Sequence, residues 1–313
     1  MIKIKEFRGL RPNPEKVEDV ASPPYDVVNS GEAREMVRGN PDSFLHVVKP
    51  EIDLPADISP YDETVYRKGR ENLDRLIADG VLIQERRPAF YFYRLIMGDI
   101  IQTGLVAGAS IVDYENDRIK KHELTRANKE ADRIKHIDTL NANTGPVFLT
   151  YQAREDMDNL TAEVIQKKPL YNFTSDDGIR HTFWKVDTPE TVERIRKIFA
   201  GIDCLYVADG HHRSASGTIV GRQRREANPN HTGEEEYNYF LSVIFPHNQL
   251  YIMDYNRVVR DLNNHSPEEF LRLISSSFEV EHRADNTPYR PESPHSFGMY
   301  LDGRWYQLTA KSG

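Results

Sequence analysis

In the stretch CLYVADGHHRSASG, residues 204–217, an acid, two imidazoles and a guanidinium lie between an apolar run and a run of small residues. The apolar run 204–208 predicts a buried strand, and the small residues that follow predict a helix from Gly210 to about Arg225. Gly210 permits a sharp turn between the two elements. The backbone N–H groups of residues 210–213 would then point outward at a helix N-terminus, where the helix dipole favours an anion. The stretch therefore predicts a strand–turn–helix unit with a phosphate-binding turn.

The side chains of this turn have complementary chemistry. Arg213 carries a permanently charged planar fork that suits phosphate, and Asp209 suits a metal ion or the proton of a hydroxyl group. The alternative is that Asp209 only caps the helix while the other side chains face solvent. A zinc site is disfavoured because adjacent histidines diverge on a helix and no further His or Cys stands at ligand spacing. Five consecutive residues with such roles favour a functional interpretation.

A second charged stretch, KKHELTRANKEADRIKH, covers residues 120–136. Its spacing predicts a helix from Thr125 to about Asn141, with Thr125 as its N-terminal cap and His122 and Glu123 in the loop before it. Glu123 is a candidate general base, because a carboxylate near basic groups stays ionised and accepts a hydroxyl proton. Arg126 begins a basic stripe on the helix. The alternative is a solvated helix stabilised by ion pairs between successive turns.

Two loops are further candidates for lining a site. The prolines of SPPYDVV, residues 22–28, predict a rigid loop that displays Tyr25 and Asp26, although most such turns are structural. The stretch NANTGPVF, residues 141–148, predicts a turn at Gly145 before another strand.

The rest of the chain predicts a mixture of strands and helices. Strands are expected at 2–7, 44–48, 89–97, 103–114, 146–151, 170–174, 181–186, 239–245 and 249–253. Further helices are expected at 30–38, 58–80, 189–199 and 267–275. Several strands follow one another as hairpins, which favours the α+β class, with a mixed or antiparallel sheet and flanking helices.

We divide the chain into an N-terminal α+β region (1–115), a region with the phosphate or nucleotide site (116–246) and a C-terminal α+β segment (247–313). The alternative is one compact domain. The last stretch predicts a hairpin with Asp302-Gly303 at its turn. No predicted element after it would cover its edge, which favours a chain that continues further.

Composition is that of a globular protein. The 313 residues are 38% hydrophobic and 29% charged, with a formal net charge of −8 that disfavours a nucleic-acid partner. No apolar run is long enough to span a membrane, and the N-terminus lacks the apolar core of a signal peptide. The single cysteine, Cys204, is expected in the core. We expect a cytoplasmic protein without membrane or nucleic-acid partners.

The chain resembles the bacterial and archaeal family known as domain-of-unknown-function family 1015. The resemblance covers nearly the whole chain. It rests on VASPPYDVV, KKHELTR…KEADRIKH, NTGPVFLTY and VADGHHRSAS, in this order and spacing.

The Asp-Gly-His-His-Arg motif is also similar to the signature of the ParB/sulfiredoxin superfamily, in which such a turn opens a helix and binds nucleotide phosphates. Free-serine kinases of that superfamily carry a related motif and an upstream glutamate base. The resemblance implies a ParB/sulfiredoxin-like core with large elaborations, and Mg²⁺ with ATP or ADP. It implies catalytic roles for Glu123, Asp209 and His211, Mg²⁺ on Asp209, and phosphate or nucleotide contacts from Gly210, His212, Arg213, Ser214, Arg126 and His122.

We therefore expect a nucleotide-dependent phosphotransferase that acts on a small hydroxyl compound, with free L-serine as the first substrate to test. The alternatives are a phosphatase or nucleotide hydrolase, and a non-catalytic nucleotide-binding regulatory protein. The absence of a GxxxxGK[ST] loop disfavours a P-loop enzyme.

Overall fold

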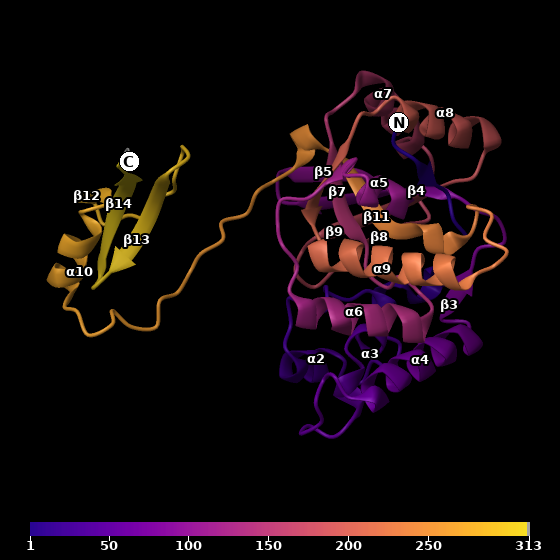
Figure 1. Cartoon of the computed structure of the whole chain (residues 1–313), viewed down its shortest axis with the longest axis horizontal. Helices are drawn as coiled ribbons and strands as arrows, with labels where there is room; N and C mark the ends of the chain where they lie inside the picture. Colours follow the sequence, from indigo (N-terminus) through magenta and orange to yellow (C-terminus); the bar gives the residue numbers. More distant parts are fainter. Residues whose placement is uncertain (312–313) are drawn as a thin grey trace. The chain divides into compact units, whose positions relative to one another are not determined.

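The computed structural model describes residues 1–311. The chain divides into two compact units, Met1–Tyr251 and the part from Ile252 onward, and each is described by itself. Strands from both of the predicted ranges 1–115 and 116–246 belong to one sheet of the first unit (Figure 1).

This sheet has nine strands, eight of them in the order β6-β10-β7-β11-β5-β4-β9-β8, and β1 pairs with β5 beside this path. The strands are β1 (Ile4–Lys5), β4 (Phe90–Met97), β5 (Ile100–Ser110), β6 (Ile119–Lys120), β7 (Val147–Tyr151), β8 (Tyr171–Thr174), β9 (Arg180–Val186), β10 (Leu205–Asp209) and β11 (Tyr239–Pro246). A separate two-stranded sheet joins β2 (Leu10–Pro12) to β3 (Leu82–Gln84).

The sheet is mixed. β10 runs parallel to β6, β11 runs parallel to β7, and the other neighbouring pairs are antiparallel. β5 has partners on both sides, so that Val106 pairs with Tyr91 of β4 and with Val243 of β11. With its flanking helices, this sheet confirms the predicted α+β class, whereas the predicted likeness of the core to ParB and sulfiredoxin stays a prediction.

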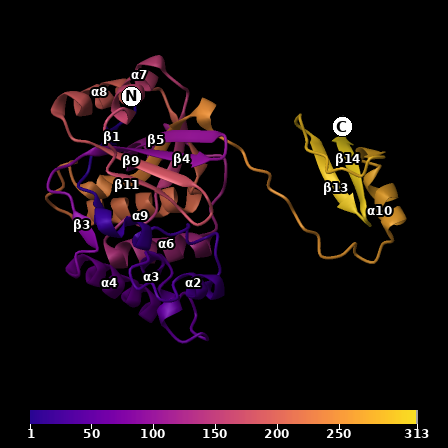
Figure 2. The ribbon, with the colours of Figure 1, turned by 180° about the vertical axis from the view of Figure 1, so that it is seen from behind.

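The helices of the first unit are α1 (Val17–Val20), α2 (Ser30–Met36), α3 (Leu45–Val48), α4 (Glu63–Ala78), α5 (Ile111–Glu115), α6 (Ala127–Leu140), α7 (Glu155–Ile165), α8 (Pro189–Ala200) and α9 (His211–Ala227). α7 and α8 insert apolar side chains such as Leu160 and Phe199 into the main core cluster, which also contains Phe92 of the sheet. In both views α6 lies between α9 and the group α2, α3 and α4 (Figures 1 and 2).

α9 packs closely because two of its residues are glycine. A Cβ atom at Gly217 would lie 3.0 Å from the Cβ of Phe240, which belongs to β11. A Cβ atom at Gly221 would lie 2.3 Å from the carbonyl oxygen of Tyr237, a distance that no side chain can occupy. The helix therefore touches the backbone of the segment that leads into β11.

The second unit contains a three-stranded antiparallel sheet in the order β12-β14-β13. Its elements are α10 (Pro267–Ile274), β12 (Phe278–His282), β13 (Ser296–Leu301) and β14 (Arg304–Ala310). Asp302 and Gly303 have φ angles of 48° and 75°. These left-handed conformations are typical of a tight hairpin turn and confirm the predicted hairpin at this position.

Two predicted strands are wrong. In the range 44–48, residues Leu45–Val48 form the short helix α3, in which Leu45 and Val48 face one apolar cluster and Val47 faces another. So short an apolar run has no period that separates strand from helix. The predicted strand 249–253 is also wrong, because the chain there pairs with no strand of the described residues. The side-chain oxygen of Gln249 instead accepts a hydrogen bond from the backbone N–H of Thr103 in β5.

Other differences concern boundaries. The predicted strand 103–114 ends at Ser110, whose hydroxyl accepts the N–H of Asp113 and begins α5. α7 was not predicted, although Met157, Leu160 and Val164 recur at helical spacing and are buried.

Among residues 1–311, no helix is both long and apolar enough to cross a membrane.

His136 makes the stability of this unit depend on pH. Its side chain is 2% exposed, and its Nε2 lies 3.2 Å from the carbonyl oxygen of Val47. Burial, assisted by the charge of Arg133, lowers the pKa of His136 from 6.5 to about 4. Between these values the unfolded chain binds more protons than the folded one, so the free energy of unfolding rises with pH and is level above the window.

We predict that His136→Gln removes this dependence, because the amide can still donate to Val47 but does not titrate. At about 1.4 kcal/mol for each pKa unit, the rise in unfolding free energy from about pH 4.5 to pH 7.5 should be roughly 2–3 kcal/mol smaller in the variant. Urea unfolding at the two pH values measures this difference. An equal rise in both proteins would contradict the prediction.

Candidate functional site

The turn between β10 and α9 has the predicted strand–turn–helix form. β10 ends at Asp209, Gly210 has a φ of 92°, and α9 begins at His211. This left-handed conformation favours glycine because a Cβ atom would strain the backbone. The N–H of Ser214 donates to the carbonyl of Gly210 at 2.9 Å and closes the first turn. The N–H groups of the residues between them have no acceptor within the helix, as at any helix N-terminus.

Arg213 joins this turn to two distant loops. Its Nη2 lies 2.7 Å from Oδ2 of Asp209 and 3.8 Å from Oδ2 of Asp26. Its Nη1 donates to the carbonyl of Pro146. The Arg213 side chain is 16% exposed, whereas that of Asp209 is 68% exposed. The loops 22–28 and 141–148, which are separate candidates in the sequence, therefore meet at one guanidinium.

His211 lies beside the loop that precedes α6. Its Nδ1 is 3.4 Å from Oε2 of Glu123, and its ring packs edge to face on His122 with 4.5 Å between the centroids. His211 is 5% exposed, and its Nε2 is buried without a hydrogen-bond partner among the described residues. Burial and the neighbouring His122 lower the pKa of His211, while Glu123 opposes the shift. Glu123 itself is exposed.

α6 anchors the proline loop from the other side. The Arg133 guanidinium lies 4.2 Å from the centroid of the Tyr25 ring, a cation–π contact. Burial raises the pKa of the Tyr25 hydroxyl. The preceding residue of α6, Asp132, binds Arg133 at 2.7 Å and accepts a hydrogen bond from the hydroxyl of Tyr66 at 2.7 Å. The loop that carries Asp26 is thus fixed to the scaffold.

The structure brings five of the predicted site residues together, namely His122, Glu123, Asp209, His211 and Arg213. His212 follows directly, and its Nδ1 is buried without a partner among the described residues.

Two predicted contacts are placed differently. Ser214 is fully buried, and its hydroxyl donates to the carbonyl of His211. Arg126 precedes α6 with an exposed side chain, and it has no ion-pair partner within residues 1–311.

The sequence analysis missed Glu130, which holds the loop before α6 to α9. Its carboxylate accepts the hydroxyl of Thr125 at 2.8 Å, and its carbonyl lies 3.2 Å from the hydroxyl of Ser216 in α9. Its position in a highly charged helix is typical of a solvated residue, so the sequence carries no signal for this role. The predicted cap at Thr125 is wrong, because α6 begins after Arg126 without a side-chain cap.

The donor groups near the turn limit how a metal ion can bind. Residues 1–311 contain no group of three or more His, Cys, Asp or Glu side chains placed to hold one. Magnesium in nucleotide sites usually takes one or two carboxylates and completes its shell with phosphate oxygens and water. The exposed carboxylate of Asp209 fits that kind of site.

We predict that Gly210→Ala destabilises the protein more than Gly178→Ala. Gly178 also has a positive φ, 81°, but a Cβ atom there would meet no atom within 4 Å, so this variant measures backbone strain alone, about 1–2 kcal/mol. At Gly210 a Cβ atom would lie 3.2 Å from Nε of Arg213 and displace the guanidinium. Urea unfolding of both variants gives the comparison. Equal losses would show that Arg213 is not held tightly at the turn.

The sequence model of the family described as "Protein of unknown function (DUF1015)" matches residues 4–313. No curated protein and no solved structure matches the chain. Since the match spans essentially the whole sequence, the chain belongs to the DUF1015 family.

Proposed function

We propose that this protein is a nucleotide-dependent phosphotransferase that acts on a small hydroxyl compound, with free L-serine as the first candidate. The observation that carries the proposal is the buried His211 in the first turn of α9, with Glu123 on one side and Arg213 two residues further on. Side chains that could bind phosphate and a carboxylate that could accept a proton lie within one small region, which supports the proposal.

The first turn of α9 supports phosphate binding. α9 has 17 residues, and the N-terminus of such a helix carries a partial positive charge and outward N–H groups. A second, independent feature is the buried Nε2 of His211, which has no partner among the described residues. An unpaired buried polar group is costly, and a phosphate oxygen would satisfy it. Arg213 adds a charge-assisted donor beside it.

Glu123 supports the transfer step. In the proposed reaction the substrate hydroxyl oxygen attacks the terminal phosphorus of the nucleotide, and the bond from this phosphorus to the leaving phosphate oxygen breaks. The hydroxyl proton passes to Glu123, whose carboxylate is exposed and lies 3.4 Å from Nδ1 of His211. The products are the phosphorylated substrate and the nucleotide with one phosphate fewer.

Asp209 is the residue that would hold Mg²⁺. The ion would supply charge neutralisation for the phosphates of the bound nucleotide. The Asp209 side chain is 68% exposed, so one carboxylate is available at the end of β10 while Arg213 contacts its Oδ2.

We predict that purified protein forms phosphoserine from L-serine with Mg²⁺ and ATP or ADP. Glu123→Gln should lower kcat by roughly 10²- to 10⁴-fold, the usual contribution of a general base, and leave nucleotide affinity nearly unchanged. Arg213→Met should instead weaken nucleotide binding by about 10- to 100-fold, as expected for loss of a charged hydrogen bond. Glu163→Gln, an exposed carboxylate on α7 that pairs with Arg194, is the matched control and should behave like wild type.

The outcomes separate the proposal from its alternatives. Inorganic phosphate release without phosphoserine would indicate a hydrolase. Nucleotide binding that Arg213→Met abolishes, without any turnover, would indicate a nucleotide-binding regulatory protein. If calorimetry detects no nucleotide binding at all, the proposal is wrong.

A further inference from the structure

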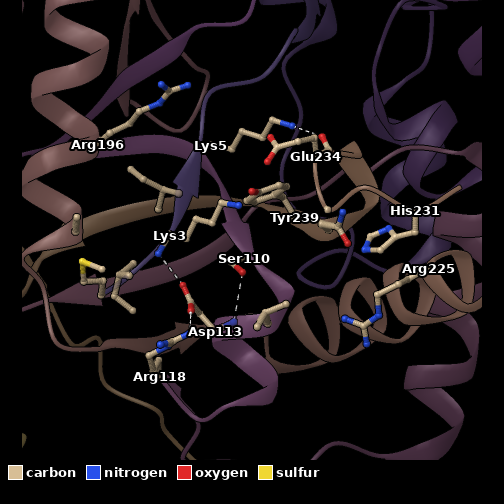
Figure 3. A pocket seen from close by; sticks show the side chains of 17 residues that line it. Lys3, Lys5, Ser110, Asp113, Arg118, Arg196, Arg225, His231, Glu234 and Tyr239 are labelled. Carbon is tan, nitrogen blue, oxygen red and sulfur yellow. Dashed lines mark hydrogen bonds and ion pairs between the residues drawn. The ribbon is translucent and has the colours of Figure 1, made fainter.

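A pocket of about 820 Å³ lies at the other end of α9 (Figure 3). Arg225, in the last turn of α9, is one of its lining residues, and it follows His211 by 14 residues. At 1.5 Å per residue this separation is about 21 Å, so the pocket and the turn at Gly210 are different places. The volume is within the range of roughly 300–1,000 Å³ that is usual for sites of small molecules.

The pocket wall is rich in positive charge, although the whole chain carries a formal charge of −8. Its lining includes the cationic side chains of Lys3, Lys5, Arg118, Arg196 and Arg225, against the two carboxylates of Asp113 and Glu234. These cations come from β1 and the residue before it, α8, α9 and the loop between α5 and β6. Elements from distant parts of the sequence thus present the same charge to one cavity.

Asp113 organises the centre of this wall. It is 1% exposed, and its Oδ2 accepts the backbone N–H of Lys3 at 2.7 Å. Its Oδ1 lies 2.7 Å from Nη2 of Arg118, which neutralises its charge. The Arg118 side chain as a whole is 42% exposed, so its guanidinium is accessible from the pocket that it lines.

The Lys3 ammonium is the unpaired charge of the pocket. It lies 5.7 Å from the centroid of the Tyr239 ring, and no carboxylate in the described part of the chain is within ion-pair distance of it. Its hydrogen bond with Tyr239 outweighs burial and raises the pKa of Lys3, so the group is charged at neutral pH. Figure 3 shows Lys3 between Asp113 and Tyr239.

Other cations of the wall are held by partners. The Arg196 guanidinium binds the carboxylate of Glu6, and Arg225 lies 3.3 Å from Glu115. These ion pairs hold the side chains at the pocket in place. The wall also has an apolar part formed by Ile2, Ile4, Val112 and Ala200.

We propose that this pocket binds a small organic anion that carries a phosphate or carboxylate head group and an apolar portion. Lys3 and the guanidinium of Arg118 would hold the head group, and the apolar residues with the Tyr239 ring would cover the remainder. The site is independent of the proposed phosphotransferase site in both position and residues.

The test is calorimetric binding to the full chain with three probes: phenyl phosphate, phthalate and inorganic phosphate. We expect phenyl phosphate or phthalate to bind, more tightly than inorganic phosphate, and the preferred probe identifies the head group. Lys3→Met should raise Kd at least tenfold. It keeps the backbone N–H that Asp113 accepts, so folding is retained. Lys197→Met is the matched control, because this exposed lysine is next to Arg196 on α8 and does not line the pocket.

A second variant tests the pocket without removing charge. Ala200→Phe places a ring in the cavity and should abolish binding. Arg213→Met, at the far end of α9, removes a donor of the proposed phosphate site and so separates binding at that turn from binding in the pocket. Loss of binding in Arg213→Met with full binding in Lys3→Met would place the anion at the first turn of α9 and overturn this proposal alone. Failure of every probe to bind, or unchanged Kd in both Lys3→Met and Ala200→Phe, would also overturn it.

Discussion

The candidate site depends on the contacts that the Arg213 guanidinium makes. It reaches Asp209 in its own turn, the carbonyl of Pro146 in the loop before β7, and Asp26 in the proline loop. Its planar fork can serve several acceptors at fixed angles, whereas a lysine ammonium would act as a single point charge. Among the described interactions, no other polar contact joins these three segments at the turn.

The helix α6 supplies the scaffold for this arrangement. Its charged sequence is typical of a solvated surface, yet it buries His136 and Leu140 and packs between α4 and α9. Two of its charges are partly buried in contacts, since Arg133 covers the Tyr25 ring and is itself neutralised by Asp132. Because partly buried charges are stable only when they are paired, these contacts hold the helix in one register against its neighbours.

Much of the local structure was predictable, and most of the assembly was not. The apolar run before Asp209 and the glycine after it suffice to predict the turn, because strand period, glycine conformation and helix onset agree there. The helical run at Leu45 was missed because it is too short to show a period. That Glu123 would lie beside His211 depends on how β6 and β7 pair with β10, and no local pattern encodes strand pairing. The pocket wall around Lys3 also depends on how distant segments of the chain pack together, which no local pattern encodes.

The glycines of α9 set how closely this helix approaches β11. A Cβ atom on Gly221 would lie 2.3 Å from the carbonyl oxygen of Tyr237, and one on Gly217 would lie 3.0 Å from the Cβ of Phe240. A larger residue at either position would push α9 away from this segment, and the first turn of the helix would move with it. The contacts of Arg213 therefore depend on two glycines that lie outside the turn itself.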